Sequence, residues 1–476
     1  MSQVNLTYNV EDKPSWGKTI VFALQQLLAI LAATIAVPAI IGHGMSPAAA
    51  LFGAGIGTLV YLLFTKFKSP VFLGSSFAFI GSMFAAFAGA VSMSVGYLGL
   101  LIGAFSAACV YAIIALIVKF VGTAWINKIM PAVVIGPTVA IIGLSLAGNA
   151  IGDLTTGSFI EGIAEVSPWT KWIGLTCGLI TLFVTIIVSV FGKKFLKMIP
   201  FIIGILSGYA AAAIFTGIGF AADVDALKII NFGKFSNMEW LPSFTFLTAF
   251  KGGFEWGDFG SFAPYLASIL VAYVPVAFVV FAEHIADHKN LSSIIGRDLL
   301  EEPGLHRTLL GDGIGSFAGA FFGGCPNTTY GESVGTVAIS GNASIRTIFV
   351  TAIMAMVLAF VAPFSTFLAT IPSCVMGGVC IALYGFIAVS GLKMIQKTDL
   401  NDNRNLFVVS VILISGIGGL ILTIGKITIT AIASALILGI VVNLVTHIKT
   451  NKKEEPAVAE SAPAEQPEEP QSEEEK

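Results

Sequence analysis

The sequence predicts an all-α polytopic membrane protein with fourteen transmembrane segments arranged as two inverted repeats of seven. Hydrophobic residues make up 56% of the 476 residues and charged residues only 11%, whereas a soluble protein carries about 25% charged residues. Apolar runs of about 20 residues, enough for a helix to cross a bilayer, recur up to about residue 450. Two of the segments are short, polar and interrupted by glycine. This composition excludes a separate soluble catalytic domain, so we expect no enzyme.

Both ends of the chain are polar. Residues 1–16 lack the basic region and short apolar core of a cleaved signal peptide, so we expect a cytoplasmic N-terminal segment and a first span that directs insertion. Residues 450–476 combine Pro, Ala and nine Glu without any aromatic residue. Such a segment cannot bury enough apolar surface to fold, so we expect a disordered acidic tail.

Between the ends we expect a first repeat over 17–220, a long external loop over 221–260 and a second repeat over 261–449. Charge clusters and turn residues separate the apolar runs. The fourteen segments begin near Gly17, Met45, Val71, Gly96, Ile126, Trp169, Met198, Phe262, Thr308, Thr328, Thr347, Ile371, Asn405 and Ile427.

The positions of Lys and Arg predict the orientation. If the N-terminus is cytoplasmic, 20 of the 25 cations fall in the termini and the even-numbered loops. Only five fall on the other side, three of them in the long loop. The positive-inside rule therefore predicts cytoplasmic termini and an even number of crossings.

Fourteen segments divide into two sevens, and an odd number per half makes the halves inverted. Weak sequence matches agree. Segment 3 contains Gly74-Ser75-Ser76-Phe77-Ala78, and segment 10 contains Asn327-Thr328-Thr329-Tyr330-Gly331. Segments 5 and 12 share Pro-x4-Gly, at Pro131 to Gly136 and at Pro372 to Gly377.

Segments 3 and 10, here called the broken segments, read FLGSSFAFIGS and CPNTTYGESVGTVAIS. Unpaired backbone in lipid costs several kcal/mol per group unless it lines a cavity or is buried in protein. Paired broken segments at matching positions of inverted repeats therefore indicate the midplane binding site of a transporter. Two buried re-entrant loops that only pack are the alternative.

Only four acidic residues before the tail lie within apolar segments, namely Glu283, Asp287, Asp312 and Glu332. A carboxyl group in the membrane is costly and normally faces a cavity or a partner on a substrate or proton path. Asp287 lies four residues after Glu283, on the same helix face. The sequence around it, HIADHKN, also fits the water interface.

The residues around Gly331 suit a neutral ligand. If Gly331 and Glu332 begin a half-helix, their free N–H groups favour acceptor atoms, and carboxylates accept ligand N–H groups. Neither broken segment holds Lys or Arg, which disfavours an anion. Phe77 and Tyr330 are placed to sandwich a flat ring, although ordinary packing explains them too, and Ser76 joins the candidate site.

The acids also provide a coupling mechanism, since a carboxyl group in a cavity can take up a proton on one side and release it on the other. We therefore assign proton coupling to Glu283, Asp287 and Glu332. Sodium coupling is an alternative, because Asn, Ser and Thr oxygens are plentiful in 327–333. The five His and five Cys show no metal-ligand spacing, so we expect neither a metal nor a cofactor.

Four motifs resemble the bacterial uracil permeases, a branch of the nucleobase/ascorbate transporter family. They are LGSSFAFIGS at Leu73 to Ser82, AEHIADH at Ala282 to His288, EEPGLHR at Glu301 to Arg307 and CPNTTYGESVGTVAIS at Cys325 to Ser340. The resemblance implies a core domain, a gate domain, short antiparallel strands in the broken segments and, commonly, a homodimer.

The resemblance also implies residue roles. Glu283 and Glu332 match the acids that hydrogen-bond uracil, and Phe77 and Gly331 match positions whose backbone N–H groups meet the uracil oxygens. Tyr384 matches an aromatic residue on the gate side of the pocket.

The chain departs from the family pattern at several positions. Gln25-Gln26 stands for Gln-His, Asp287 for a His linked to coupling, Ser333 for Asn and Ser340 for Thr. These departures leave open which nucleobase is transported and how coupling depends on pH.

The resemblance, together with the acids in the broken segments, implies a transporter in a bacterial inner membrane that imports uracil with a proton. Its partners are uracil, the proton, the lipid bilayer and a second copy of the chain, with no nucleic acid. A purine permease for xanthine or urate, an anion transporter of the sulfate or bicarbonate type, and a passive channel are the alternatives.

Overall fold

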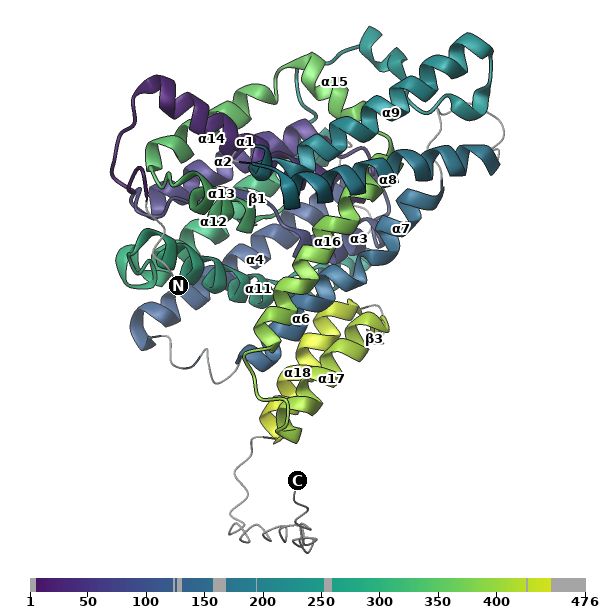
Figure 1. Ribbon diagram of the computed structural model, residues 1–476. Helices are drawn as coiled ribbons and strands as arrows, with labels where there is room; N and C mark the ends of the chain where they lie inside the picture. Colours follow the sequence, from purple (N-terminus) through teal and green to yellow (C-terminus); the bar gives the residue numbers. More distant parts are fainter. Residues whose placement is uncertain are drawn as a thin grey trace, which may run out of the picture.

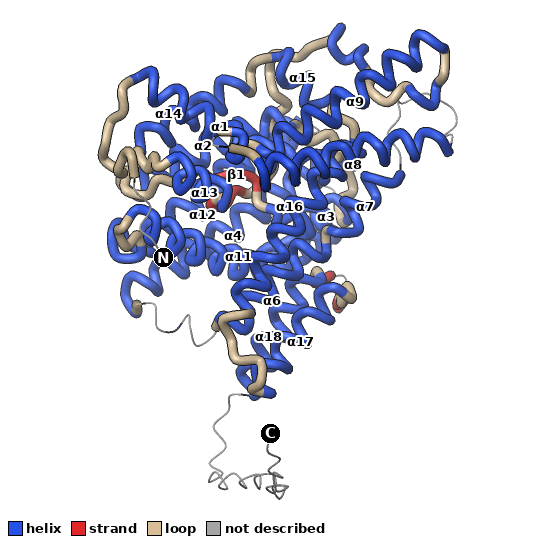
Figure 2. Tube along the Cα trace, in the orientation of Figure 1, coloured by secondary structure: helices blue, strands red, loops and turns tan. Residues whose placement is uncertain are grey.

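The computed structural model describes residues 6–122, 125, 131–156, 168–193, 195–251, 259–424 and 427–446. Figure 2 shows that these residues are mostly helical, with two small two-stranded sheets. The acidic tail and the start of predicted segment 5 near Ile126 lie outside the described residues. Residues 252–258 of the predicted external loop also lie outside them.

The helices fall into two halves of the chain, separated by the long connection between α9 and α11. The first half contains α1 (Trp16–Ile41), α2 (Pro47–Phe64), α3 (Ile80–Ala88), α4 (Met93–Val121), α6 (Ala132–Ser145), α7 (Ala147–Thr156), α8 (Pro168–Phe191) and α9 (Pro200–Ala222). The connection includes α10 (Thr245–Lys251). The second half contains α11 (Phe259–Ile295), α12 (Leu305–Gly323), α13 (Gly331–Ser340), α14 (Ile345–Leu358), α15 (Ala362–Thr370), α16 (Ser373–Ile395), α17 (Asn403–Ile417) and α18 (Ala431–Thr446).

The four strands are short and form two pairs. One pair joins segments far apart in the sequence, and the other joins neighbouring strands. Strand β1 (Leu73–Ser75) pairs antiparallel with β2 (Asn327–Thr329). Strand β3 (Leu422–Ile424) pairs antiparallel with β4 (Ile427–Ile429), just before α18. The first pair joins the two halves of the chain in the interior, because all six of its residues are buried.

Eight helices of the described chain are long and apolar enough to cross a membrane, or nine when α14 and α15, bent by 81°, are taken as one span. This finding confirms a polytopic membrane protein. Three further apolar helices, Phe77–Ala88, Asn403–Ile417 and Ala431–Thr446, are shorter. At these places sequence hydropathy overestimates the length of the helix, because part of the apolar run forms a strand or a turn.

Capping residues determine several helix ends. The Ser46 side chain accepts a hydrogen bond from the Ala49 N–H, with Pro47 at the first helical position of α2. Both features favour a helix start. Gly324 and Gly341 end α12 and α13 in the left-handed conformation, with φ of 77° and 65°, which glycine adopts without steric cost.

The helices form two groups that Figure 1 distinguishes. In the first group α12 packs against α2 and α4, α14 packs against α1 and α2, and α11 packs against α4. In the second group α16 packs against α6, α7 and α8, while α17 and α18 pack on each other and on α6. The two groups meet where α11 contacts α6 and α18 and where α1 contacts α9 and α16.

Close approach of α2 and α12 holds the first group together. A Cβ atom built on Gly315 of α12 would lie only 2.7 Å from the Gly57 carbonyl oxygen of α2 and 3.0 Å from Leu73 Cδ2 of β1. Small residues are the usual means by which membrane helices bring their backbones together. The crossing therefore fixes α2, α12 and β1 relative to one another.

The N-terminal segment before α1 lies along the turn between α13 and α14. Tyr8 forms a parallel bridge with Asn342, and the Thr7 N–H donates to the Gly341 carbonyl over 2.7 Å. Arg297, just after α11, forms an ion pair with Glu11 at 3.1 Å. These contacts attach the N-terminal segment to the C-terminal end of α13, the end opposite β2.

Candidate functional site

The site begins where β1 and β2 pair and give way to helices. Leu73 lies opposite Thr329, and Ser75 lies opposite Asn327. The Ser76 N–H extends the pairing by donating to the Pro326 carbonyl over 2.8 Å. A 3-10 turn and α3 follow Ser76, and α13 follows Tyr330. The first N–H groups of a helix have no intrahelical partner. The helices that follow β1 and β2 therefore place two sets of backbone N–H donors at the end of one sheet.

Acids predicted from the sequence lie at the end of this sheet. Asp287 of α11 accepts a hydrogen bond from Thr329 of β2, Oγ1 to Oδ2, over 2.8 Å. A Cβ atom built on Gly331 would lie 4.0 Å from Asp287 Oδ1. The Glu283 carboxyl interacts electrostatically with Asp287, Glu332 and Asp312. Asp287 and Glu332, which are far apart in the sequence, thus lie at the N-terminus of α13, and Glu283 interacts with both.

Phe77 and Tyr384 come from the two helix groups and contact each other. Their ring centroids lie 6.0 Å apart with the planes at 79°, an edge-to-face arrangement of ordinary stability. Phe77 belongs to the turn after β1 and Tyr384 to α16, so this contact joins the two helix groups. It places Tyr384 beside the candidate site.

Tyr330 lies behind the sheet. Its ring covers Gly74, where a Cβ atom would collide with it, and its hydroxyl donates to the Ser75 carbonyl over 2.9 Å. The side chain is 4% exposed. Tyr330 therefore supports the strand pair, and a sandwich of a flat ring between Phe77 and Tyr330 stays a prediction.

Several polar atoms of the sheet have no partner among the described residues. Ser76 Oγ and Thr328 Oγ1 are buried without a hydrogen bond, as is Asn327 Oδ1. Asn327 Nδ2 does donate to the Gly53 carbonyl over 3.1 Å. Buried polar groups are nearly always satisfied by protein, water or ligand, so these atoms favour a polar occupant near the sheet.

Sequence reasoning missed two supporting residues. Gln26 of α1 donates through Nε2 to Ser333 Oγ of α13, and the Phe72 N–H donates to the same oxygen over 2.9 Å. Both positions depart from the pattern of the family, so the two departures touch each other. That both positions differ from the family pattern is the sequence feature that could have revealed the pair. Their hydrogen bonds join α13 to α1 and to the residue before β1.

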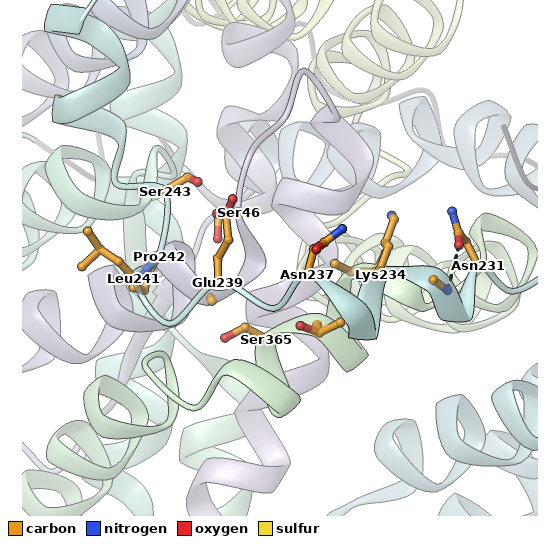
Figure 3. Close-up of a pocket in the computed structure, with 13 residues that line it drawn as sticks. Ser46, Asn231, Lys234, Asn237, Glu239, Leu241, Pro242, Ser243 and Ser365 are labelled. Carbon is orange, nitrogen blue, oxygen red and sulfur yellow. Dashed lines mark hydrogen bonds between the residues drawn. The ribbon is translucent and has the colours of Figure 1, made fainter.

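A separate pocket of about 450 Å³ lies away from these residues. Figure 3 shows it between the 231–243 segment, the start of α2 and α15. Lys234 crosses toward α15 and donates to the Ala369 carbonyl over 3.0 Å. None of the predicted site residues lines this pocket, so we assign it to the connection rather than to the site.

Comparison with known proteins gives concordant results. A model of a permease family matches residues 17–425. The chain is 38% identical over 447 residues to a uracil permease of Bacillus caldolyticus, covering 92% of this chain and 94% of that protein. It is 37% identical over 455 residues to a uracil permease of Bacillus subtilis (strain 168), covering 94% and 96%. The resemblance drawn from the motifs is confirmed.

Among solved structures, the transmembrane domain of a cyanobacterium bicarbonate transporter, BicA, has the same fold. The TM-score is 0.58 at 16% identity, and the alignment covers 92% of this chain and 98% of that one. At this identity the similarity concerns the fold alone.

Proposed function

This chain belongs to the nucleobase/ascorbate transporter family, and on that premise we propose that it imports uracil together with a proton by alternating access. The single observation that supports this most is the convergence of Glu283, Asp287 and Glu332 on the N-terminus of α13. Uracil has alternating N–H donors and carbonyl acceptors. Its N–H groups suit the carboxylates of Glu283 and Glu332, and its carbonyls suit the N–H groups of Phe77 and Gly331.

We propose fourteen segments in two inverted repeats, and the register of β1 and β2 supports this. The motif match equates Gly74 with Asn327 and Ser75 with Thr328. In the sheet Gly74 pairs with Thr328 and Ser75 with Asn327, which is the exchange that a two-fold axis between the paired residues produces. Inverted repeats of this kind place the substrate site near the midplane.

The second motif match supports the same proposal. Pro131 and Pro372 directly precede α6 and α16, and these two helices pack against each other. We propose that the first helix group is the core domain and the second the gate domain. The repeats then cover 17–220 and 261–449, joined by the external loop 221–260.

We further propose that the protein lies in the bacterial inner membrane with both termini cytoplasmic, as a homodimer. The distribution of the cations supports this orientation. The acidic tail is then exposed to the cytoplasm.

Uptake of labelled uracil by permease-deficient cells tests the function. We expect saturable accumulation that a protonophore abolishes, that a sodium gradient does not restore, and that unlabelled xanthine and urate do not inhibit. Competition by purines would instead indicate a purine permease. Accumulation driven by sodium would replace the proton as the coupling ion.

Replacing Asp287 with Asn should retain uracil binding but lower proton-driven accumulation by about 100-fold, the lower part of the range for a positioned proton-transfer group. The amide oxygen can still accept the hydrogen bond from Thr329, so the site keeps its geometry, but it cannot carry a proton. Binding and accumulation would be measured on the same proteoliposomes. Full accumulation by this variant would remove Asp287 from coupling, and Asp225→Asn on the external loop provides the exposed control.

A further inference from the structure

Helix α11 carries a second titratable cluster, in which His284 and His288 lie next to Asp312 of α12. His284 and His288 directly follow the site acids Glu283 and Asp287 in the sequence, and their rings stack at 4.0 Å. His284 is 0% exposed, His288 1% and Asp312 of α12 1%. Two of these three buried groups, His284 and His288, are thus sequence neighbours of the site acids on α11.

Thr308 determines which nitrogen of His284 carries a proton. The Thr308 hydroxyl donates to the Leu305 carbonyl over 3.0 Å, so its oxygen is free to accept. His284 Nε2 lies 2.9 Å from that oxygen and therefore donates to it. Because a hydroxyl group has a single proton to give, Nε2 of His284 is protonated.

One further proton is then shared between His284 and Asp312. His284 Nδ1 lies 2.7 Å from Asp312 Oδ2, and a hydrogen bond at this distance contains one proton. Either a carboxylic acid donates to a neutral imidazole or an imidazolium donates to a carboxylate. Both forms are neutral overall, and a buried unpaired charge is costly. The pair therefore holds one exchangeable proton.

Asp312 keeps one buried oxygen, Oδ1, without a hydrogen-bond partner among the described residues. The Asp312 carboxyl interacts electrostatically with both Glu283 and Asp287. Tyr111 of α4 interacts with both Asp312 and Glu283, and its hydroxyl also lacks a partner among these residues.

Both ring nitrogens of His288, the other histidine of this cluster, are occupied. His288 Nδ1 donates to the His284 carbonyl over 2.8 Å, so its Nε2 is the acceptor for the Tyr61 hydroxyl at 2.6 Å. Tyr61 lies 2.7 Å from Ser69 Oγ. Beyond Ser69, Lys68 forms an ion pair with Glu302 at the surface. This branch fastens α11 to α2 and shares no proton with the site.

We propose that His284 and Asp312 form a second proton-holding site, which exchanges its proton with Glu283 during transport. The proton of the Glu283 carboxyl moves to Asp312 Oδ1 while the proton on Asp312 Oδ2 moves to His284 Nδ1. Glu283 becomes a carboxylate and His284 an imidazolium, so total charge is conserved. The inference rests on the proposed proton symport. Thr308 is the positioning residue.

Asp312→Asn tests it in proteoliposomes of the full-length protein. The amide keeps a hydrogen bond to His284 but holds no proton. Exchange of internal for external uracil needs no net proton release, whereas net uptake does. We expect exchange close to that of the wild type and net proton-driven uptake lower by about 100-fold. The control, Tyr61→Phe, removes a buried hydrogen bond to the other α11 histidine, His288, and should keep the wild-type ratio of net uptake to exchange.

An unchanged ratio in Asp312→Asn would overturn the inference, as would an equal fall in Tyr61→Phe. A wild type whose uptake ignores the proton gradient would overturn the proposed function itself, and this inference with it. Thr308→Val gives a second measure if Asp312→Asn does not fold. Val has no oxygen to accept the Nε2 proton of His284, so the tautomer of His284 is no longer fixed. We expect the pH of half-maximal net uptake to shift while exchange stays unchanged. An unmoved pH profile would contradict the role of the pair.

Discussion

Replacing Glu332 with Gln should weaken uracil binding by about 100-fold. Glu332 is the acid in the first turn of α13, the helix that follows the strand pair. A hydrogen bond to a charged group contributes about 1.5–3 kcal/mol, and each 1.4 kcal/mol is a factor of about ten in affinity. The amide of Gln also brings an N–H group where uracil presents one, so donor faces donor.

Calorimetric titration of purified protein with uracil measures this loss. The matched control is Glu301→Gln, because Glu301 is exposed on the connection before α12 and its substitution should leave the affinity unchanged. Melting temperatures of both variants should match that of the wild type, which separates binding from folding. Wild-type affinity in Glu332→Gln would place uracil elsewhere and contradict the proposed site.

The site acids could be found from the sequence because charge inside an apolar segment is costly and therefore informative. Sorting the acids by position left Glu283, Asp287, Asp312 and Glu332, and in the structure Glu283 interacts electrostatically with each of the other three. Asp287 was ambiguous, since HIADHKN resembles a membrane interface. In the structure Asp287 lies inside α11, which continues to Ile295, and accepts a hydrogen bond from Thr329 of β2, so it faces the strand pair.

The partners of these acids were not predictable from local patterns. Thr329 reaches Asp287 only because β1 and β2 pair in one register, and register depends on contacts between distant segments. The histidines of α11 were considered only as metal ligands. Their spacing gave no hint that Asp312 and Tyr61, 28 and 227 residues from their histidine partners, would hydrogen-bond them.

Helix packing was the other limit. Glycines in the segments after Met45 and Thr308 were visible as composition, but nothing local distinguished Gly315, which contacts α2, from Gly217 of α9. A Cβ atom at Gly217 would meet none of the described residues within 4 Å. The difference lies in which helix faces which, and that follows from the whole fold.

Replacing Gly315 with Leu should therefore prevent folding, whereas Gly217→Leu should be tolerated. A Cβ atom at Gly315 would lie 2.7 Å from the Gly57 carbonyl oxygen, a backbone atom that cannot rotate away, and the rest of the side chain would push α2 and β1 aside. Overpacking typically costs about 1–3 kcal/mol and sometimes more, against a total stability of about 5–15 kcal/mol.

The two leucine variants make a matched pair, because both replace a helical glycine by a good helix former that is about 1 kcal/mol more favourable in a helix. The fraction of monodisperse protein after detergent extraction, followed by the melting temperature, measures the outcome. We expect little folded Gly315→Leu and a normal yield of Gly217→Leu. Since β1 carries Leu73 against the same crossing, any Gly315→Leu that is recovered should also bind uracil poorly. Equal yields and affinities for the two variants would show that α2 and α12 do not cross here.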